Sequence, residues 1–410
     1  MTRRILFASH ACYLDDSNGA AVASRALMQA LARRGCAVAV VSGTMLDREE
    51  EVEPAAWIAA RGERFEAVVN QAWTFDAGGV RPEVPDHFRL SVRGVPVTLH
   101  RGPTTRPHEP DDAEGREFLQ LFDAVAARFR PEVVVGYGGS RLARAVFARA
   151  RAAGAATVFV LHNFGYRSAE PFADVDAIVV ASRFAAERYR EALGLECIVL
   201  PNPVDFDRVR VEQPEPRFVT FVNPATEKGV FAFARIADEL GRRRPDIPLL
   251  VVEGRGGEAT LAACGLDLRA HGNLYVMPST ADPRAFWRVT RLCLVPSLCW
   301  ENQPLVAVEA MLNGIPVLGS DRGGLPETLG RAGVVLPLPA WLTPSSRAVP
   351  TAAEVAPWIE AIVRLWDDAD LYAERRRLAR DEARRWAPEV LEPRYARFFT
   401  ELRSEPAASG

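Results

Sequence analysis

The stretch from residue 292 to residue 330 constrains the fold more than any other part of the chain. An apolar run at 292–295 is typical of a buried strand, and a polar loop after it leads to a helix that begins at Pro304 and ends at Gly314. A second apolar run, 315–319, precedes another turn and helix start. The pattern predicts a strand–helix–strand unit with both strand-to-helix junctions at one edge of a parallel sheet. Ligands of open α/β sheets bind at that edge, and phosphates bind at helix N-termini.

Two carboxylates lie in this unit, Glu301 in the loop and Glu309 in the helix, with seven residues between them. An ionised carboxylate only accepts hydrogen bonds, so it suits the vicinal hydroxyls of a sugar. Taken singly, the two residues are better explained as a solvated loop glutamate and a surface helix position. Together, within a frame of prolines and glycines at the ligand edge of a sheet, they favour a sugar-binding site.

The run P-S-x3-E-x7-E-A-M-x2-G-I-P-V, followed by S-D-x-G-G-L-P-E, resembles the signature of the family-4 retaining glycosyltransferases. The resemblance extends over nearly the whole chain. It implies the GT-B fold, an α/β architecture of two Rossmann-like domains that face each other across a cleft, with a C-terminal helix that crosses back to the N-terminal domain. It also implies sugar transfer from a nucleoside-diphosphate donor with retention of the anomeric configuration.

A length of 410 residues is enough for two domains, each with its own core. We expect an N-terminal Rossmann-like acceptor-binding domain at 1–202 and a Pro-rich, charged hinge at 203–217. A C-terminal Rossmann-like domain that binds the nucleotide sugar is expected at 218–387. The segment at about 388–404 is expected to form the helix that rejoins the N-terminal domain.

Composition argues against several classes of protein. A net charge of −3 argues against a dedicated nucleic-acid binder, and six scattered cysteines argue against a cysteine zinc site or a disulfide framework. The chain enters its first strand without a signal peptide, and no apolar run reaches the roughly 18 residues that a membrane helix needs. We therefore expect a cytoplasmic protein with at most peripheral membrane association, and its oligomeric state stays open.

In the N-terminal half, a strand at 4–8 is followed by a helix that Gly19 begins. Gly19-Ala20 stands where the resembling family has Gly-Gly, and small residues there allow backbone amides to approach a diphosphate. His162 ends an apolar strand at 156–161, at the ligand edge of the sheet. In the family, a histidine at the end of this strand contacts the donor sugar at the reaction centre, so His162 is the predicted catalytic residue of this half.

In the C-terminal half, a strand at 218–222 leads to Lys228, the only lysine of the chain. The family usually has G-R-L-x3-K-G here, and its arginine and lysine grip the diphosphate. Lys228 matches the lysine, whereas Asn223 replaces the arginine, which removes a charge-assisted bidentate contact. Arg255 or Arg322 could compensate, and the sequence does not decide between them.

The resemblance implies that Glu301 holds sugar hydroxyls and that Glu309 binds the ribose diol. The predicted catalytic residues are His162 and Glu301, and the predicted donor-binding residues are Gly19, Ala20, Asn223, Lys228, Arg255, Asn302, Gln303, Pro304, Leu305, Val306 and Glu309. We expect no metal and no cofactor beyond the nucleoside-diphosphate sugar, with UDP favoured. The expected reaction moves a hexose or N-acetylhexosamine to a hydroxyl of a small-molecule or glycan acceptor by front-face attack, in polysaccharide, glycoconjugate or natural-product biosynthesis.

Other interpretations stay open. Two Asp-x-Asp triplets, at 174–176 and 205–207, match a metal motif of other sugar transferases, and we interpret both as solvated turns. A non-catalytic homologue that binds nucleotide sugars is consistent with Asn223, and a GT-B nucleotide-sugar epimerase is a further alternative. A pyridoxal-dependent phosphorylase would need a Schiff-base lysine, whereas Lys228 is placed for a diphosphate.

Overall fold

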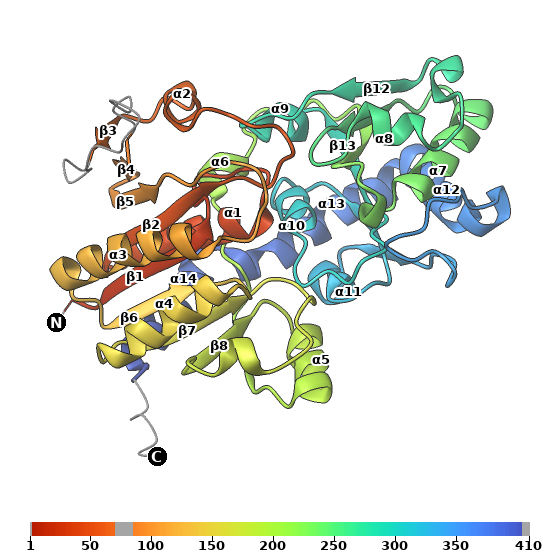
Figure 1. The fold of residues 1–410 in the computed structure, drawn as a ribbon. Coiled ribbons are helices and arrows are strands. Elements are labelled where there is room, and N and C mark those ends of the chain that lie inside the picture. Colours follow the sequence, from red (N-terminus) through yellow and green to blue (C-terminus); the bar gives the residue numbers. More distant parts are fainter. Residues whose placement is uncertain (1, 70–84, 404–410) are drawn as a thin grey trace, which may run out of the picture. The chain divides into compact units, whose positions relative to one another are not determined.

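A computed structural model describes residues 2–69 and 85–403, and the chain divides into two compact units. Unit 1 comprises Met1–Val180, Tyr189–Pro203 and Leu391–Gly410, and unit 2 comprises Ala181–Arg188 and Val204–Val390. Each unit is an α/β structure built on a sheet (Figure 1). In the described part of the chain, no helix has both the length and the apolar character needed to span a bilayer.

The described strands of unit 1 form a sheet in the order β3-β4-β5-β2-β1-β6-β7-β8-β9. The pairs from β5 through β9 are parallel, and β3 and β4 extend the sheet as antiparallel strands. The strands are β1 (Arg4–Ala11), β2 (Ala37–Met45), β3 (Phe65–Val68), β4 (His87–Val92), β5 (Val95–His100), β6 (Val133–Gly136), β7 (Ala156–Leu161), β8 (Ala177–Val180) and β9 (Cys197–Val199).

Helices α3 and α4 lie side by side over one face of this sheet (Figure 1). Their apolar stripes bury Phe118 and Val146 in a core that also contains Leu6 and Val134 of the sheet. Amphipathic helices of this kind derive most of their stability from such packing. The helices of unit 1 are α1 (Gly19–Arg33), α2 (Pro54–Ala60), α3 (Asp112–Phe129) and α4 (Arg141–Ala152). Unit 1 also contains α14 (Pro388–Glu401) from Leu391 on and α5 (Arg183–Leu193) from Tyr189 on.

The sheet of unit 2 has the order β12-β11-β10-β13-β14-β15, and all its pairs are parallel. The chain therefore builds outwards from β10 to one side, returns to the centre, and builds to the other side, as in a doubly wound Rossmann fold. The strands are β10 (Phe218–Val222), β11 (Leu249–Val252), β12 (Leu274–Met277), β13 (Thr290–Val295), β14 (Val317–Ser320) and β15 (Val334–Leu336).

Helices α7 and α12 pack together in the main core of unit 2. Phe233 of α7 stacks on Phe221 of β10, with ring centroids 4.7 Å apart, and Trp358 of α12 is fully buried. The helices of unit 2 are α6 (Phe206–Val209), α7 (Val230–Arg243), α8 (Glu258–Ala262), α9 (Arg284–Trp287), α10 (Leu305–Leu312), α11 (Leu325–Leu329), α12 (Ala352–Asp367) and α13 (Ala369–Ala383).

The predicted α/β fold is confirmed: the sheet of unit 2 is parallel, and the sheet of unit 1 is parallel apart from β3 and β4. The strands expected at 156–161 and 218–222 have those bounds, because each is a mainly apolar run with a single threonine and is largely buried. The first strand is longer than expected and continues to Ala11, which brings His10 onto the sheet. Helix α10 begins at Leu305, one residue later than predicted, since Pro304 is extended and forms its N-cap. Gly314 closes it at φ 65°, as its sequence predicts.

The terminal helix α14 is anchored to the rest of unit 1 by two buried side chains. Glu392 accepts hydrogen bonds from Arg33 and Arg34 at the end of α1, at 2.6–3.0 Å. The hydroxyl of Tyr395 donates to the carbonyl oxygens of Leu200 and Pro201, each at 3.1 Å. The last helix of the chain thus belongs to the core of the first unit.

Candidate functional site

The centre of the unit 2 sheet is a topological switch point. Strands β10 and β13 are neighbours, and the chain leaves them towards opposite sides of the sheet. The loop after β10, 223–229, and the loop after β13, 296–304, therefore leave the same carboxyl edge next to each other. This is the place where open α/β sheets bind ligands.

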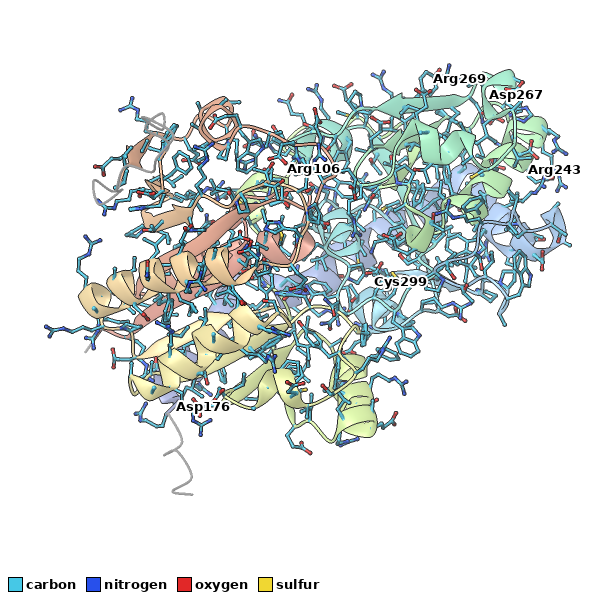
Figure 2. All side chains as sticks on the ribbon, viewed as in Figure 1. Arg106, Asp176, Arg243, Asp267, Arg269 and Cys299 are labelled. Carbon is cyan, nitrogen blue, oxygen red and sulfur yellow. The ribbon has the colours of Figure 1, made fainter. Side chains whose placement is uncertain are left out.

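These two loops are held together through their backbones. The amides of Leu298 and Cys299 donate to the carbonyl oxygen of Glu227 at 2.9 and 3.1 Å (Cys299 is labelled in Figure 2). Gly229 has φ 87°, and a Cβ at this position would lie 1.9 Å from the carbonyl oxygen of Pro296. Only glycine fits there, because any side chain would force the loops apart.

Lys228 and Glu301 form an ion pair at this switch point. Lys228 Nζ lies 2.6 Å from Glu301 Oε1, and Ser297 Oγ donates to the same oxygen at 2.6 Å. Burial alone would raise the pKa of Glu301, but Lys228 and Ser297 lower it below its usual value. Burial alone would lower the pKa of Lys228, but Glu301 raises it above its usual value. Both groups are therefore charged near pH 7.

Arg255 lies beside this pair. Its guanidinium makes an ion pair with Glu227 at 3.2 Å, and its charge contributes to the pKa shifts of both Lys228 and Glu301. Arg322 is engaged elsewhere, since its Nη2 donates to the carbonyl oxygens of Leu338 and Pro339 in the following loop. Of the two arginines that could replace the missing one, the structure brings Arg255 to the Lys228 loop.

Asn223 has a conformational role that its sequence position does not reveal. Its backbone is left-handed, with φ 60°, a region that asparagine tolerates better than arginine. Its Oδ1 accepts from the amide of Gly256 at 3.1 Å, which ties the loop after β10 to the loop after β11. Asparagine at this position therefore shapes the loop that carries Lys228.

The N-terminus of α10 lies on the loop that carries Glu301. Pro304 is the N-cap residue of the helix, and no side chain caps its first turn. The amides of Leu305 and Val306 are among the first four of the helix, which lack intrahelical acceptors, and both residues are half-buried. Asn302 and Gln303 before them are buried, and Asn302 Oδ1 accepts from Ser182 Oγ at 2.9 Å.

Glu309 lies deeper in α10, in a different environment from Glu301. Trp287 Nε1 donates to its Oε2 at 3.1 Å, and Arg208 and Asp205 act on it through their charges. Burial raises the pKa of Glu309 to about 7, and the Trp287 hydrogen bond and Arg208 offset only part of that shift. Glu309 is thus the carboxyl group of this helix that changes charge near neutral pH.

In unit 1, the loop after β1 leads to the N-terminus of α1. Helix α1 begins at Gly19, as predicted, and Asn18 caps it. Asn18 Oδ1 accepts from the amides of Ala20 and Ala21 at 2.9 and 3.2 Å. The amide of Ala20 is therefore already used by the cap, whereas Gly19 is exposed.

His162 follows the last residue of β7 at the carboxyl edge of the unit 1 sheet. Its ring meets that of Tyr137 edge to face, with centroids 5.2 Å apart. Its Nε2 is buried and has no hydrogen-bond partner among the described residues. Burial lowers the pKa of His162 to about 4, so the ring is neutral at pH 7 and can serve as a hydrogen-bonding group.

Two family models match neighbouring parts of the sequence and together cover most of it. The model described as Glycosyltransferase Family 4 matches residues 17–208, and the model described as Glycosyl transferases group 1 matches residues 215–368. The chain belongs to the group 1 and family 4 glycosyltransferases. It is an enzyme that transfers a glycosyl group.

Solved glycosyltransferase structures share this fold over nearly the whole chain. Sucrose-phosphate synthase from Thermosynechococcus elongatus is 15% identical with a TM-score of 0.68, covering 98% of this chain and 99% of its own. HepE from Anabaena, in complex with UDP-glucose, is 15% identical at a TM-score of 0.63, covering 97% and 100%. The catalytic domain of starch synthase IV from Arabidopsis thaliana, bound to ADP and acarbose, is 12% identical with a TM-score of 0.64. The match covers 98% of this chain and 100% of the starch synthase domain. A search of curated proteins gave no match.

In this glycosyltransferase, the structure brings Lys228, Arg255 and Glu301 together at the switch point of unit 2, next to the N-terminus of α10. The sequence predicted Lys228 and Glu301 in the same donor site, but it did not predict their direct contact. Nor did it predict Ser297, although the P-S dipeptide of the motif marks that position. Trp287 as the partner of Glu309 leaves no signal in the sequence, because it comes from a different helix.

The two Asp-x-Asp triplets of the glycosyltransferase have local structural roles. Asp205 caps α6 by accepting from the amide of Arg208 at 3.3 Å. Asp176 is buried and accepts from the amide and hydroxyl of Thr157 at 2.8 and 3.0 Å. The interpretation of Asp176 as a solvated turn residue was wrong, because its carboxylate joins β7 to the start of β8.

Proposed function

We propose that this glycosyltransferase retains the anomeric configuration and moves a hexose or N-acetylhexosamine from a nucleoside-diphosphate sugar to a hydroxyl of its acceptor. The observation that carries the proposal is the Lys228–Glu301 ion pair at the switch point of unit 2, on the loop that begins α10. A diphosphate is the leaving group, so positioning and charge stabilisation should supply most of the rate enhancement.

The charges around Lys228 suit a diphosphate that arrives with a sugar. Glu301 neutralises Lys228 in the absence of donor, which keeps a half-buried lysine charged and in place. On donor binding, we expect the phosphate oxygens to take over contacts of Lys228, while Glu301 accepts from sugar hydroxyls. Arg255 supplies a second positive charge beside Lys228 and compensates for the arginine that Asn223 replaces.

The helix α10 supplies the remaining donor contacts in this proposal. The amides of Leu305 and Val306 at its N-terminus donate hydrogen bonds to phosphate oxygens. Asn302 and Gln303, which precede them, bind polar groups of the sugar donor. Glu309 accepts from the ribose diol. In unit 1, Gly19 and Ala20 keep the predicted approach to the diphosphate, with the Ala20 amide released from Asn18 on binding.

For the chemical step, we propose front-face attack without a metal at the diphosphate. The acceptor hydroxyl oxygen forms the new bond to the anomeric carbon as the bond to the diphosphate oxygen breaks. The departing oxygen takes the proton of the acceptor hydroxyl. His162 keeps its predicted contact to the donor sugar, and its neutral ring at pH 7 suits a hydrogen bond to a sugar hydroxyl.

The nucleotide base of the donor is proposed to be uracil. HepE, solved with UDP-glucose, supports UDP, whereas the starch synthase IV structure contains ADP, so this choice needs its own test. Thermal-shift measurements with UDP-, ADP- and GDP-linked sugars should identify the donor, and acceptors can then be screened with it. A larger shift with an ADP-sugar than with any UDP-sugar would contradict the choice of UDP.

The experiment that tests the whole proposal compares sugar transfer by wild type with Lys228→Ala and Glu301→Gln. We expect each to lower kcat by about 10²–10³-fold, the range measured for loss of one electrostatic contact to developing charge. Glu258→Gln is the matched control, because Glu258 is half-exposed at the start of α8 and is not part of the proposed site. Normal transfer by both site variants would sink the proposal, and so would inversion of the anomeric centre in the product.

A further inference from the structure

A cluster of two histidines and a glutamate lies at the carboxyl edge of the unit 1 sheet, and the proposed chemistry does not use it. His10 is the penultimate residue of β1, His108 lies in the loop after β5, and Glu114 is in the first turn of α3. Among the described residues, the three form the one group of potential metal ligands whose ligand atoms all lie within 4.8 Å of one another.

The geometry of the cluster is close to a coordination sphere. Glu114 Oε1 lies 2.8 Å from His10 Nε2, and Glu114 Oε2 lies 2.8 Å from His108 Nε2. Donor atoms bound to one tetrahedral zinc ion lie about 3.3 Å apart, which follows from bond lengths of about 2.0–2.1 Å. Each histidine nitrogen therefore needs to move away from the carboxylate oxygen that it faces by only about half an ångström to reach this spacing.

The orientation of His108 is one that a metal ligand could adopt. Its Nδ1 lies 2.9 Å from the carbonyl oxygen of Arg106, which can only accept, so Nδ1 carries a hydrogen (Arg106 is labelled in Figure 2). Its Nε2 faces Glu114 Oε2 at 2.8 Å, and a metal ion would take the place of the hydrogen that lies between these two atoms. Metal-binding histidines are oriented in this way, with the second ring nitrogen bonded to a carbonyl and the first directed at the ion.

The surroundings hold the three side chains in place. Glu114 is buried at 4% exposure, and Asp111 caps the start of its helix by accepting from the amides of Ala113 and Glu114. A Cβ on Gly102 would lie 2.8 Å from Glu114 Oε1, so the loop backbone closes over the carboxylate. The ring of Phe118 packs edge to face on His10 and gives the cluster an apolar side.

We propose that His10, His108 and Glu114 bind a divalent transition-metal ion of the zinc class. Two imidazole nitrogens and one carboxylate oxygen are a ligand set typical of zinc sites that keep a coordination position open. An ion here would stand at the ligand-binding edge of unit 1 and offer that position to water or to an oxygen of a bound molecule. The proposal does not depend on the mechanism of sugar transfer, since none of the three residues belongs to the proposed donor site.

The test is zinc binding by the full chain, prepared without a histidine tag and stripped with a chelator. Isothermal titration with Zn²⁺ should give one site per chain, and Co²⁺ at that site should show the intense visible absorption of four-coordinate cobalt. His108→Asn and Glu114→Gln should each weaken zinc binding by at least about 10-fold, since loss of an outer partner alone costs 10–100-fold. Chelator-treated variants with the melting temperature of chelator-treated wild type show that folding is intact.

Two controls keep the result specific. His271→Asn removes a histidine of unit 2 that is bonded to Asp238, and Glu301→Gln impairs the proposed transfer site. Both should bind zinc like wild type. Absence of saturable zinc binding by wild type, or equal binding by His108→Asn, would overturn the site and leave a charged histidine–glutamate hydrogen-bond network instead. Absence of sugar transfer by wild type, with zinc binding present, would count against the proposed function alone.

Discussion

At the scale of single residues, the two glutamates of the E-x7-E motif have opposite electrostatic environments. Glu301 lies against Lys228 and Ser297, which lower its pKa. Glu309 lies against Trp287, and burial raises its pKa to about 7. When the environments of two carboxyl groups give them very different pKa values, the two groups can serve different functions. Glu301 is permanently charged at neutral pH, and Glu309 titrates there.

This difference predicts a pH-dependent donor affinity that depends on Glu309. The ionised form accepts from a ribose diol through both oxygens, and protonation below about pH 7 turns one oxygen into a hydroxyl donor and weakens these contacts. The dissociation constant for the nucleotide should therefore rise as pH falls from about 8 to about 6. In Glu309→Gln the affinity should be lower at the higher pH and nearly independent of pH over this range. Isothermal titration at several pH values measures it, and a variant that keeps the wild-type pH dependence would contradict the role.

The same raised pKa predicts how Glu309 affects folding. The folded protein holds the proton between the unfolded-state pKa near 4.5 and about 7, so protonation favours folding at the lower pH values. The free energy of unfolding contributed by Glu309 should thus fall as pH rises through about 7. Urea unfolding of wild type and Glu309→Gln at about pH 6 and about pH 8 checks the sign, because the glutamine variant should lose less stability at the higher pH.

Asn223 makes a prediction about backbone conformation. Asn223→Gly relieves the left-handed backbone but loses the bond to Gly256, whereas Asn223→Ala loses that bond and adds strain. We expect the alanine variant to be less stable than the glycine variant by about 1 kcal/mol. Denaturant unfolding followed by tryptophan fluorescence measures both. Equal stability of the two variants would mean that φ at this position does not constrain the sequence.

At the scale of elements, the site of unit 2 depends on two loops that touch without side chains between them. Gly229 in one loop meets Pro296 in the other, and Gly323 in the loop after β14 forms a backbone bridge with Glu301. The carboxyl edge is thus built from three loops in backbone contact. This arrangement fixes Glu301 from both sides and leaves its carboxylate directed at Lys228.

Gly229→Ala should disrupt this packing. A Cβ there would lie 1.9 Å from the Pro296 oxygen on a left-handed backbone, so the loops must separate. We expect a loss of about 3 kcal/mol or more, together with loss of transfer, whereas Gly265→Ala should cost only about 1–2 kcal/mol. Gly265 is the matched control, because its φ is 69° and a Cβ there meets open space. Similar melting temperatures for the two variants would argue against tight loop packing.

At the scale of the whole molecule, the sequence predicts the order of strands and helices far better than it predicts the side-chain contacts of the site. The strands at 156–161 and 218–222 are mainly apolar runs with one threonine each, and Gly314 closes α10 where its sequence pattern ends. The Lys228–Glu301 contact joins residues far apart in the sequence, so it depends on which strands become neighbours. Spacing within a segment cannot reveal that order.

The role of Asn223 could not be predicted from the sequence for a different reason. Its left-handed φ is a property of the folded loop, and the sequence alone shows only that the family's arginine is missing. The His10–His108–Glu114 cluster was not predicted either, because its members come from a strand end, a loop and a helix start. The sequence thus indicates which elements meet at the carboxyl edge, and the fold decides which side chains touch.

The packing of α14 in unit 1 gives a prediction about the stability of that unit. Glu392 of α14 is buried between Arg33 and Arg34, and Glu392→Ala leaves both arginines without this partner at the end of α1. We expect a loss of about 1–3 kcal/mol, with Arg394→Ala on the exposed face of α14 as the near-neutral control. Hydrogen exchange should show faster opening of the unit 1 strands β1 and β2, whose helix α1 carries the arginines. Protection of the unit 2 strands β10 and β13 should stay as in wild type, because their core contains no part of α14. An equal loss of protection in both sheets would mean that the two units unfold as one.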